Sequence, residues 1–197
     1  MDESALIAAA KKGDVHAFNT LVRSYQRLAY NVAYRVLSDP ESAADATQEA
    51  FVSAYRAIRQ FRDGSFRAWI LRIVTNACYD ELRKKKRRQE DSLDDLLAEN
   101  PDHSDMMADD QELPEEHALR RELGATLQRG LGTLPEEQRL AVVLSDVQGF
   151  SYEEIAEVMG VALGTVKSRI SRGRAALRDY LSGQGELLPA AYRLASE

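Results

Sequence analysis

Residues 151–181 constrain the fold of this chain more than any other stretch, because they have the pattern of two helices joined by a short turn. Ser151, with Glu154 three positions later, predicts a capping box at the start of the first helix. Gly160 stands where that helix should end, since glycine adopts a left-handed conformation at little cost. On the second helix, apolar residues at helical spacing predict a buried stripe of Val166, Ile170, Leu177 and Leu181.

Outside that stripe the second helix is basic and carries hydroxyl groups, at positions Lys167, Ser168, Arg169, Ser171, Arg172 and Arg174. A two-helix unit with such a face predicts a helix-turn-helix, whose second helix fits the DNA major groove. The alternative is an ordinary amphipathic hairpin with solvated charges. We favour DNA binding because the capping box, the glycine turn and the basic helix coincide. Either Arg169 or Arg174 could still be a plain surface charge that faces away from DNA.

The first half of the chain has helical periodicity with clear start signals. Asp14 is predicted to cap a long helix, and Asp39 followed by Pro40 predicts the start of the next one. Four helices are expected, over residues 6–12, from 14 to about 36, from 39 to about 60, and from 66 to about 86. No stretch alternates with period two for long enough to predict a strand. The predicted fold class is therefore all-α.

The net charge of −6 conceals a strong asymmetry along the chain. Residues 83–88 are six basic residues in a row, whereas residues 89–116 hold twelve acids and no lysine or arginine. Without those twelve acids the net charge would be +6, so the acidic balance does not argue against nucleic-acid binding, which depends on local charge. Sparse apolar content predicts that this segment is a largely disordered linker. The expected organisation is a helical domain 1–88, an acidic linker 89–116, a helical domain 117–182 and a tail 183–197 of unassigned role.

Composition excludes several classes of protein. The single cysteine, Cys78, excludes an internal disulfide and a cysteine-based zinc site, and it favours a reducing compartment. Three scattered histidines suggest no metal site. No apolar run approaches a membrane span and no signal peptide opens the chain, so we expect a cytoplasmic protein without direct membrane insertion. Since no phosphate-binding glycine loop or nucleophile motif is present, neither an enzyme nor a cofactor is expected.

A second functional signal lies around the loop at residues 61–65 and the helix that follows it. Phe61 and Arg62 precede this helix, Asn76 lies on it, and the basic run ends it. Aromatic rings beside guanidinium and amide groups suit unpaired bases, which need a stacking surface, a counter-charge for phosphate and a base-edge reader. The alternative is that Phe61, together with Phe66 and Trp69, belongs to the apolar core, and taken singly each aromatic favours that alternative.

Three motifs together carry a resemblance to a known family. They are DATQEAFVSAYRAIRQF, FRAWILRIVTNACYDELRKKKRR and LPEEQRLAVVLSDVQGFSYEEIAEVMGVALGTVKSRISRGRAAL. In this order they resemble a group IV, extracytoplasmic-function (ECF) sigma factor of bacterial RNA polymerase, over residues 17–181. The resemblance implies a sigma-2 and a sigma-4 domain joined by a linker, without an intervening sigma-3 domain. It also implies a transcription initiation factor that directs core polymerase to promoters and helps to melt the minus-ten region.

The resemblance assigns roles to particular positions. It implies contacts with core polymerase by Asp45, Gln48 and Glu49, which without the motif would be plain solvent-facing residues. It implies binding of the melted minus-ten element by Phe61, Arg62, Asn76, Arg83 and Lys84. It implies binding of the minus-thirty-five element by Thr165, Lys167, Ser168, Ser171 and Arg172. Ser171 departs from the larger residue that many relatives carry at its position.

The implied partners are core RNA polymerase, promoter DNA as duplex and as melted non-template strand, and an anti-sigma factor. The acidic linker would then either mimic nucleic acid in the basic RNA-exit path of the polymerase or simply keep the tether soluble and off DNA. The alternative function is a free-standing helix-turn-helix regulator that binds an operator. That alternative explains residues 151–181 but leaves the loop, the basic run and the polymerase-like motif unexplained.

Overall fold

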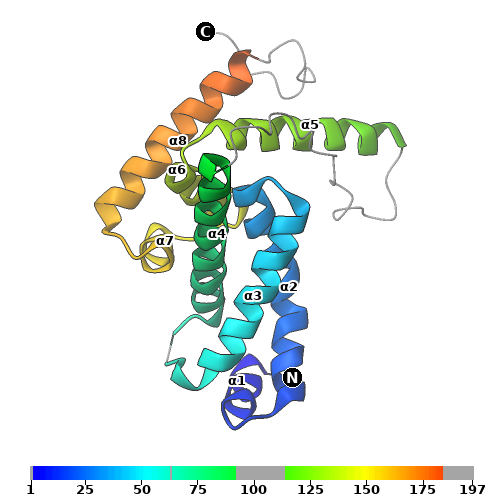
Figure 1. The fold of residues 1–197 in the computed structure, drawn as a ribbon, viewed down its shortest axis with the longest axis vertical. Coiled ribbons are helices and arrows are strands. Elements are labelled where there is room, and N and C mark those ends of the chain that lie inside the picture. Colours follow the sequence, from blue (N-terminus) through cyan, green and yellow to red (C-terminus); the bar gives the residue numbers. More distant parts are fainter. Residues whose placement is uncertain (1, 63, 92–113, 184–197) are drawn as a thin grey trace.

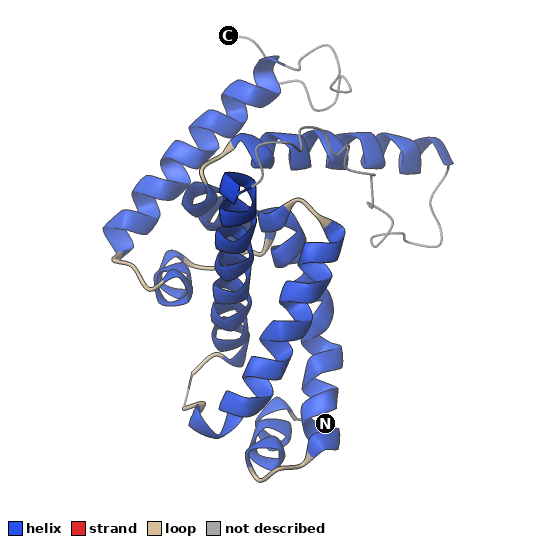
Figure 2. Cartoon of the chain, viewed as in Figure 1, coloured by secondary structure: helices blue, strands red, loops and turns tan. Residues whose placement is uncertain are grey.

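The computed structural model describes residues 2–62, 64–91 and 114–183, and every regular element within them is helical (Figures 1 and 2). The predicted all-α class is therefore confirmed. The first part contains α1 (Glu3–Lys11), α2 (Val15–Leu37), α3 (Pro40–Ala57), a 3-10 turn η1 (Ile58–Gln60) and α4 (Phe66–Asp91). The second part contains α5 (Pro114–Thr133), α6 (Glu136–Val142), a π turn η3 (Val143–Val147), α7 (Tyr152–Met159) and α8 (Leu163–Gly183).

The predicted caps set the helix boundaries in the first part. The Asp14 carboxylate accepts hydrogen bonds from the backbone N–H groups of His16 and Ala17, at 2.8 and 3.1 Å. Asp39 accepts from the backbone N–H of Ser42 at 2.7 Å, and Pro40 occupies the first turn of α3. These contacts satisfy donors that a helix start leaves open. Helices α2, α3 and α4 then pack on one another around buried alanine, valine and leucine residues. Helix α1 packs against the first turns of α2 in a second apolar cluster.

The helix-turn-helix of the second part forms as the sequence predicts. Ser151 and Glu154 make a reciprocal capping box at the start of α7, with hydrogen bonds of 3.2 and 2.9 Å. Gly160 ends α7 in the left-handed conformation, with φ of 65°. Val166 and Ile170 are buried, whereas Leu177 and Leu181 of the predicted stripe are only half-buried.

The two parts of the chain pack directly against each other. One continuous apolar core joins residues of α2, α3 and α4 to residues of α5, α6, η3, α7 and α8. In Figure 1, α4 runs between α3 on one side and the α7–α8 unit on the other, while α5 crosses one end. The sequence analysis expects two domains on a flexible tether and gives no sign of this packing, because the residues that make it are far apart in the chain.

The predicted linker lies mostly outside the described residues, as does most of the predicted tail. Helix α4 continues to Asp91 and α5 begins at Pro114, so each extends by three residues into the segment expected to be linker, 89–116. Proline is compatible with this start, since its missing N–H would have no partner in the first helical turn. Helix α8 ends at Gly183, and residues 184–197 are not described.

Candidate DNA-binding and polymerase-binding surfaces

The predicted minus-thirty-five residues lie together on α8. Lys167, Ser171 and Arg172 are exposed, whereas Thr165 and Ser168 are half-buried. The Ser168 hydroxyl donates to the Thr165 backbone carbonyl at 2.9 Å, within the first turns of the helix. The burial of Val166 and Ile170 turns the opposite face outward. The structure therefore presents one basic, hydroxyl-bearing helix face of the kind that enters a major groove.

Two further arginines of α8, Arg169 and Arg174, pair with acids of the preceding elements. Arg169 pairs with Glu137 of α6. Arg174 bonds both carboxylate oxygens of Asp146, at 2.9 and 2.5 Å. The Arg174 guanidinium holds the pKa of Asp146 below its ordinary value through these hydrogen bonds. Both arginines thus pair α8 with acids of the preceding helices, and which of them faces away from DNA stays a prediction.

Two neighbours of the α8 face, Tyr152 and Arg178, are not predicted from the sequence. A hollow of about 380 Å³ is lined by Tyr152, Lys167, Ile170, Ser171, Arg174, Ala175 and Arg178. Arg178 lies one turn beyond Arg174, and its side chain is 65% exposed. Helical spacing alone would have placed Arg178 on this face, because it follows Lys167 by eleven residues, which is three helical turns. Tyr152 belongs to α7, so only the packing of the two helices brings it here.

The predicted minus-ten residues on α4 form a second basic surface. Asn76 is exposed, and Arg72 is exposed one turn earlier on the same helix. Arg83 and Lys84 lie further along, where they line a hollow of about 580 Å³ with Glu49, Asp80, Lys86 and Arg87. Lys84 contacts Glu81 at 3.3 Å and Glu49 of α3 at 3.9 Å. The structure therefore brings one predicted polymerase-binding residue next to two predicted DNA-binding residues.

Phe61 belongs to an aromatic cluster at the start of α4. Its ring centroid lies 5.5 Å from that of Phe66 and 5.2 Å from that of Trp69. Phe66 is buried, so the core alternative holds for it, whereas Phe61 and Trp69 are half-buried. The Lys11 ammonium of α1 lies 5.4 Å from the Phe61 ring centroid. Arg62, beside this cluster, is exposed.

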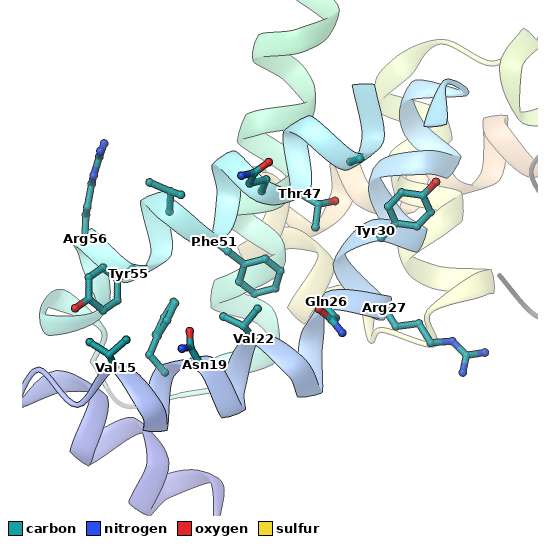
Figure 3. Close-up of a pocket in the computed structure, with 14 residues that line it drawn as sticks. Val15, Asn19, Val22, Gln26, Arg27, Tyr30, Thr47, Phe51, Tyr55 and Arg56 are labelled. Atoms are coloured by element: carbon teal, nitrogen blue, oxygen red, sulfur yellow. The ribbon is translucent and has the colours of Figure 1, made fainter. Parts of the chain in front are cut away.

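An apolar groove lies between α2 and α3 (Figure 3). It has a volume of about 980 Å³, and Gln48 is one of its lining residues. Large apolar side chains at its edge are unusually exposed: Val15 at 49%, Val52 at 44% and Tyr55 at 42%. Asp45 and Glu49 are exposed on the same helix as Gln48. The sequence predicts the polar residues of this face but not the apolar groove, because the α2 wall of the groove lies about thirty residues earlier in the chain.

The described residues show no reactive thiol, metal site or membrane-spanning helix besides these surfaces. Cys78 is 1% exposed, and burial raises the pKa of its thiol to about 12, so it is a structural thiol. In residues 2–62, 64–91 and 114–183 no cluster of three or more metal-ligating side chains occurs. None of the helices in these ranges is both long enough and apolar enough to cross a membrane.

Both parts of the chain match known protein families. A family model described as Sigma-70 region 2 matches residues 21–88, and one described as Sigma-70, region 4 matches residues 125–177. The RNA polymerase sigma-H factor of Pseudomonas aeruginosa is 39% identical over 178 residues, which cover 89% of this chain and 91% of that factor. The chain belongs to the sigma-70 family. It is an ECF sigma factor, and thus a transcription initiation factor rather than an enzyme.

Two further similarities agree with this membership. The ECF RNA polymerase sigma factor SigE of Mycolicibacterium smegmatis is 39% identical over 175 residues, which cover 89% of this chain but 65% of that factor. Among solved structures, the sigma factor RpoE of Bartonella quintana, in complex with the anti-sigma factor NepR, aligns with a TM-score of 0.68. That alignment has 28% identity and covers 85% of this chain and 98% of that one.

Every predicted site residue falls within a matched region of the sigma-70 family. The residues expected at polymerase and at the minus-ten element lie within 21–88, and those expected at the minus-thirty-five element lie within 125–177. Most of the α2–α3 groove also lies within the first region; the lining residues outside it are Val15, Phe18 and Asn19. Sigma factors bind core RNA polymerase and promoter DNA, so these exposed surfaces are the ones to test.

Proposed function

We propose that this sigma factor reads the minus-thirty-five element with α8, captures the melted minus-ten element with α4 and its preceding loop, and binds core polymerase through α3. The division into a sigma-2 domain at 1–88, a linker at 89–116 and a sigma-4 domain at 117–182 is part of this proposal. The observation that carries it is the selective pairing of charges on α8. Lys167, Ser171 and Arg172 are exposed, whereas Arg169 and Arg174 are held by acids of their own domain.

The α8 face suits duplex DNA. Arginine can donate two hydrogen bonds to guanine in the major groove, which gives Arg172 the chemistry to read a base. Lys167 offers a point charge suited to phosphate, and Arg178 at the far end of the hollow offers another. Thr165 and Ser168 are half-buried beside these residues, and the Ser168 hydroxyl bonds the Thr165 backbone carbonyl within the first turns of the helix. Base reading by Arg172 then supplies specificity, and phosphate contacts supply position.

The α4 face suits unpaired DNA. Asn76 carries both a donor and an acceptor, so it can read a base edge. Arg62 and the accessible part of Phe61 lie at the start of the helix, where a flipped base could stack and its phosphate could be neutralised. The exposed Arg83 and the half-buried Lys84 continue the positive charge along the strand. Trapping an extruded base offsets the loss of stacking, which is a few kcal/mol.

The α3 face suits a protein partner. Gln48 lies in the apolar groove, with the exposed Asp45 and Glu49 beside it. An apolar groove rimmed by polar groups is the pattern of a protein interface. Since sigma factors bind core polymerase, we assign the groove and these three residues to that contact. The shared hollow of Glu49 with Arg83 and Lys84 would place bound polymerase next to the melted strand.

Transcription with purified core polymerase tests this function directly. The protein should direct start sites at a defined set of promoters in a genomic template library, each with a shared minus-ten and minus-thirty-five sequence. Core polymerase alone should not direct start sites at these promoters. If the protein alone binds duplex operators specifically as a dimer and adds no start sites with core polymerase, the free-standing regulator is the correct function.

We also propose that an anti-sigma factor regulates this protein and that it acts in the cytoplasm, where polymerase and DNA are found. The support is that the similar Bartonella quintana sigma factor was crystallised with one. The exposed groove of α2 and α3 and the α8 face are the surfaces such a partner would need to cover. A pull-down from resting and stressed cells tests this. Recovery of core polymerase as the only stoichiometric partner under both conditions would contradict it.

A further inference from the structure

Helix α1 lies against the segment that leads into the proposed base-capture loop. Its buried residues Leu6 and Ala10 belong to the same apolar cluster as Ile58 of η1, and α1 packs on η1 beside the end of α3 (Figure 1). Phe61 follows η1 directly, and its backbone N–H donates to the Ile58 carbonyl at 3.1 Å. Helix α1 therefore supports the point at which the loop begins.

A tight turn after α1 fixes the place of its last residues. Gly13 has a φ of 98°, in the region that glycine adopts at little cost. The Gly13 N–H donates to the Ala10 carbonyl at 2.9 Å, and the Asp14 N–H donates to the Ala9 carbonyl at 3.1 Å. These bonds satisfy carbonyl groups that the helix end leaves open. Lys11, in the last turn of α1, is thus carried on a closed helix end.

The first turn of α1 is tied to the aromatic cluster by a polar contact. The Tyr25 hydroxyl of α2 donates to the Glu3 carboxylate. Burial and this hydrogen bond raise the pKa of Tyr25 to about 12, so the hydroxyl keeps its proton at neutral pH. The Tyr25 ring meets the Phe66 ring edge-on, with 5.4 Å between their centroids. Glu3 and Tyr25 therefore link the start of α1 to the start of α4.

Lys11 completes the contact from the other end of α1. Its ammonium group lies over the Phe61 ring, 5.4 Å from the centroid, and its side chain is half-buried. The same ring contacts Phe66 and Trp69 of α4, with centroid distances of 5.5 and 5.2 Å. A cation over an aromatic face is attracted to the ring, so Lys11 adds a contact from α1 to those from α4. Together these neighbours restrict the orientation of the Phe61 ring.

A restricted ring is better prepared to receive a base. Stacking requires one ring orientation, and a ring that is already held loses less conformational freedom when a base binds. The exposed Arg62 follows Phe61 in the chain, so its place also depends on how Phe61 is held. Lys11 precedes residues 21–88, which match the family model, so that match gives it no role.

We propose that Lys11 is a positioning residue for base capture, which holds the Phe61 ring and the adjoining loop in the arrangement that receives an unpaired base of the minus-ten element. Lys11 acts through Phe61 and does not itself touch DNA. Without the contact, fewer molecules have the ring in place, and the apparent affinity for the melted strand falls by that fraction. The inference rests on the proposed role of Phe61.

Binding of single-stranded DNA to the complex with core polymerase tests this role. The probe is a fluorescent oligonucleotide with the non-template minus-ten sequence of a promoter found in the transcription experiment. Lys11→Gln removes the charge over the ring, and Lys12→Gln removes the exposed charge next to it at the same helix end. Lys11→Gln should weaken binding about two- to fivefold, the worth of an exposed cation–π contact, and Lys12→Gln should not. Equal binding by wild type and Lys11→Gln, or equal losses in both variants, overturns the inference.

A double-mutant cycle shows whether Lys11 acts through Phe61. Because Phe61→Leu removes the aromatic face, Lys11→Gln should have no further effect in the Phe61→Leu protein. Losses that multiply in the double variant would mean that Lys11 contacts DNA by itself, which overturns a positioning role. The salt dependence gives the same answer, because loss of a phosphate contact flattens it and loss of a positioning contact leaves it unchanged.

An abasic scan of the oligonucleotide separates this inference from the proposed function. An abasic site at the captured position should weaken binding by the wild type, and both Phe61→Leu and Lys11→Gln should reduce that sensitivity. If Phe61→Leu keeps the full sensitivity, the proposed base capture by Phe61 is wrong, and the role of Lys11 falls with it. If Phe61→Leu loses the sensitivity and Lys11→Gln keeps it, only the inference about Lys11 is overturned.

Discussion

At the scale of single residues, the basic side chains of α8 differ in whether they pair with an acid. Five basic residues follow one another along this helix within twelve positions, and sequence alone gives them similar chemistry. Arg169 and Arg174 have acids within reach across the domain, so their guanidinium groups are used in packing. Lys167 and Arg172 have no such acid in the described ion pairs and stay exposed. We therefore expect different consequences from apparently similar substitutions.

Arg172→Ala and Lys167→Ala should separate base reading from phosphate binding. If Arg172 makes a bidentate contact, its loss should weaken use of the preferred promoter by about 1–3 kcal/mol and relax the sequence preference at one base pair. Lys167→Ala should instead weaken all promoters alike and flatten the dependence on salt. Transcription over a set of minus-thirty-five variants at several salt concentrations measures both effects. Unchanged output from both variants would contradict the assignment of this face.

The Asp146–Arg174 pair should give a pH-dependent stability. The pKa of Asp146 is lowered in the folded protein by the Arg174 hydrogen bonds, so its contribution is complete above the unfolded pKa of about 4 and is lost as pH falls through the folded value. Both side chains are more than a third exposed, so we expect Asp146→Asn to cost about 0.5–1 kcal/mol at pH 7. Urea unfolding at pH 7 and pH 3 should show a smaller difference at the lower pH. A difference of the same size at both pH values would assign it to packing instead.

At the scale of elements, short local signals fix where the functional helices begin. The capping box of α7 needs two residues three positions apart, and both hydrogen bonds form. Helix α4 begins just after a loop in which Ser65 accepts a hydrogen bond from the Ala68 backbone N–H at 3.1 Å. These caps set the helical register, and the register decides which side chains face outward. A change in a cap should therefore alter the predicted DNA-binding face through the register of the helix.

Ser151→Ala should destabilise the protein by about 1 kcal/mol, because it leaves a helix N–H without its partner and frees Glu154. Ser53→Ala on α3 is the control, since this serine is exposed in a helix interior. Chemical denaturation of both variants at neutral pH measures the difference. Equal stability of the two variants would mean that the capping box contributes nothing in this fold.

Asn76→Ala should spare polymerase binding and reduce open-complex formation, because Asn76 is exposed and its removal leaves the core of α4 intact. Arg62→Ala should act in the same direction. For Phe61 we choose Phe61→Leu, which keeps apolar volume against Phe66 and Trp69 while removing the aromatic face. Permanganate footprinting on duplex and premelted templates measures opening. Premelting should rescue part of each defect, and defects that persist fully on a premelted template would contradict a role in base capture.

At the scale of the whole molecule, one core couples both halves of the free chain. Buried residues of α2, α3 and α4 belong to the same cluster as those of α5 to α8. Small domains that share a core unfold together, whereas domains on a free tether unfold separately. The shared core therefore predicts that the two halves unfold as one unit.

Leu140→Ala should lower the unfolding midpoint seen from both halves. Leu140 is 1% exposed in α6, and its truncation should cost about 2–5 kcal/mol. Trp69 is the only tryptophan and packs with Phe61 and Phe66 in the first half, so its fluorescence reports that half alone. Circular dichroism reports both halves. Trp69 fluorescence and circular dichroism should shift together, and an unchanged fluorescence transition would show that the halves fold independently.

Sequence by itself determined the local elements and most of the candidate site residues. Helical periodicity, the caps of Asp14, Asp39 and Ser151, and the turn at Gly160 depend on residues a few positions apart, so their physics is already present in a short peptide. The order of the three motifs, which indicated the sigma-70 family, is also read directly from the sequence. For this reason α4 and α8 form close to the predicted ranges, whereas the roles of their outward faces stay predictions.

Only the tertiary structure decided which charges remain free and how the two halves meet. The pairing of Arg174 with Asp146 and the α2–α3 groove join residues about thirty positions apart, and the contacts of Gln128 and Arg139 with the end of α2 join residues about a hundred positions apart. Neither partner in such a pair carries a local signal for the other. Their contacts arise only when burial of the shared apolar core brings distant helices together.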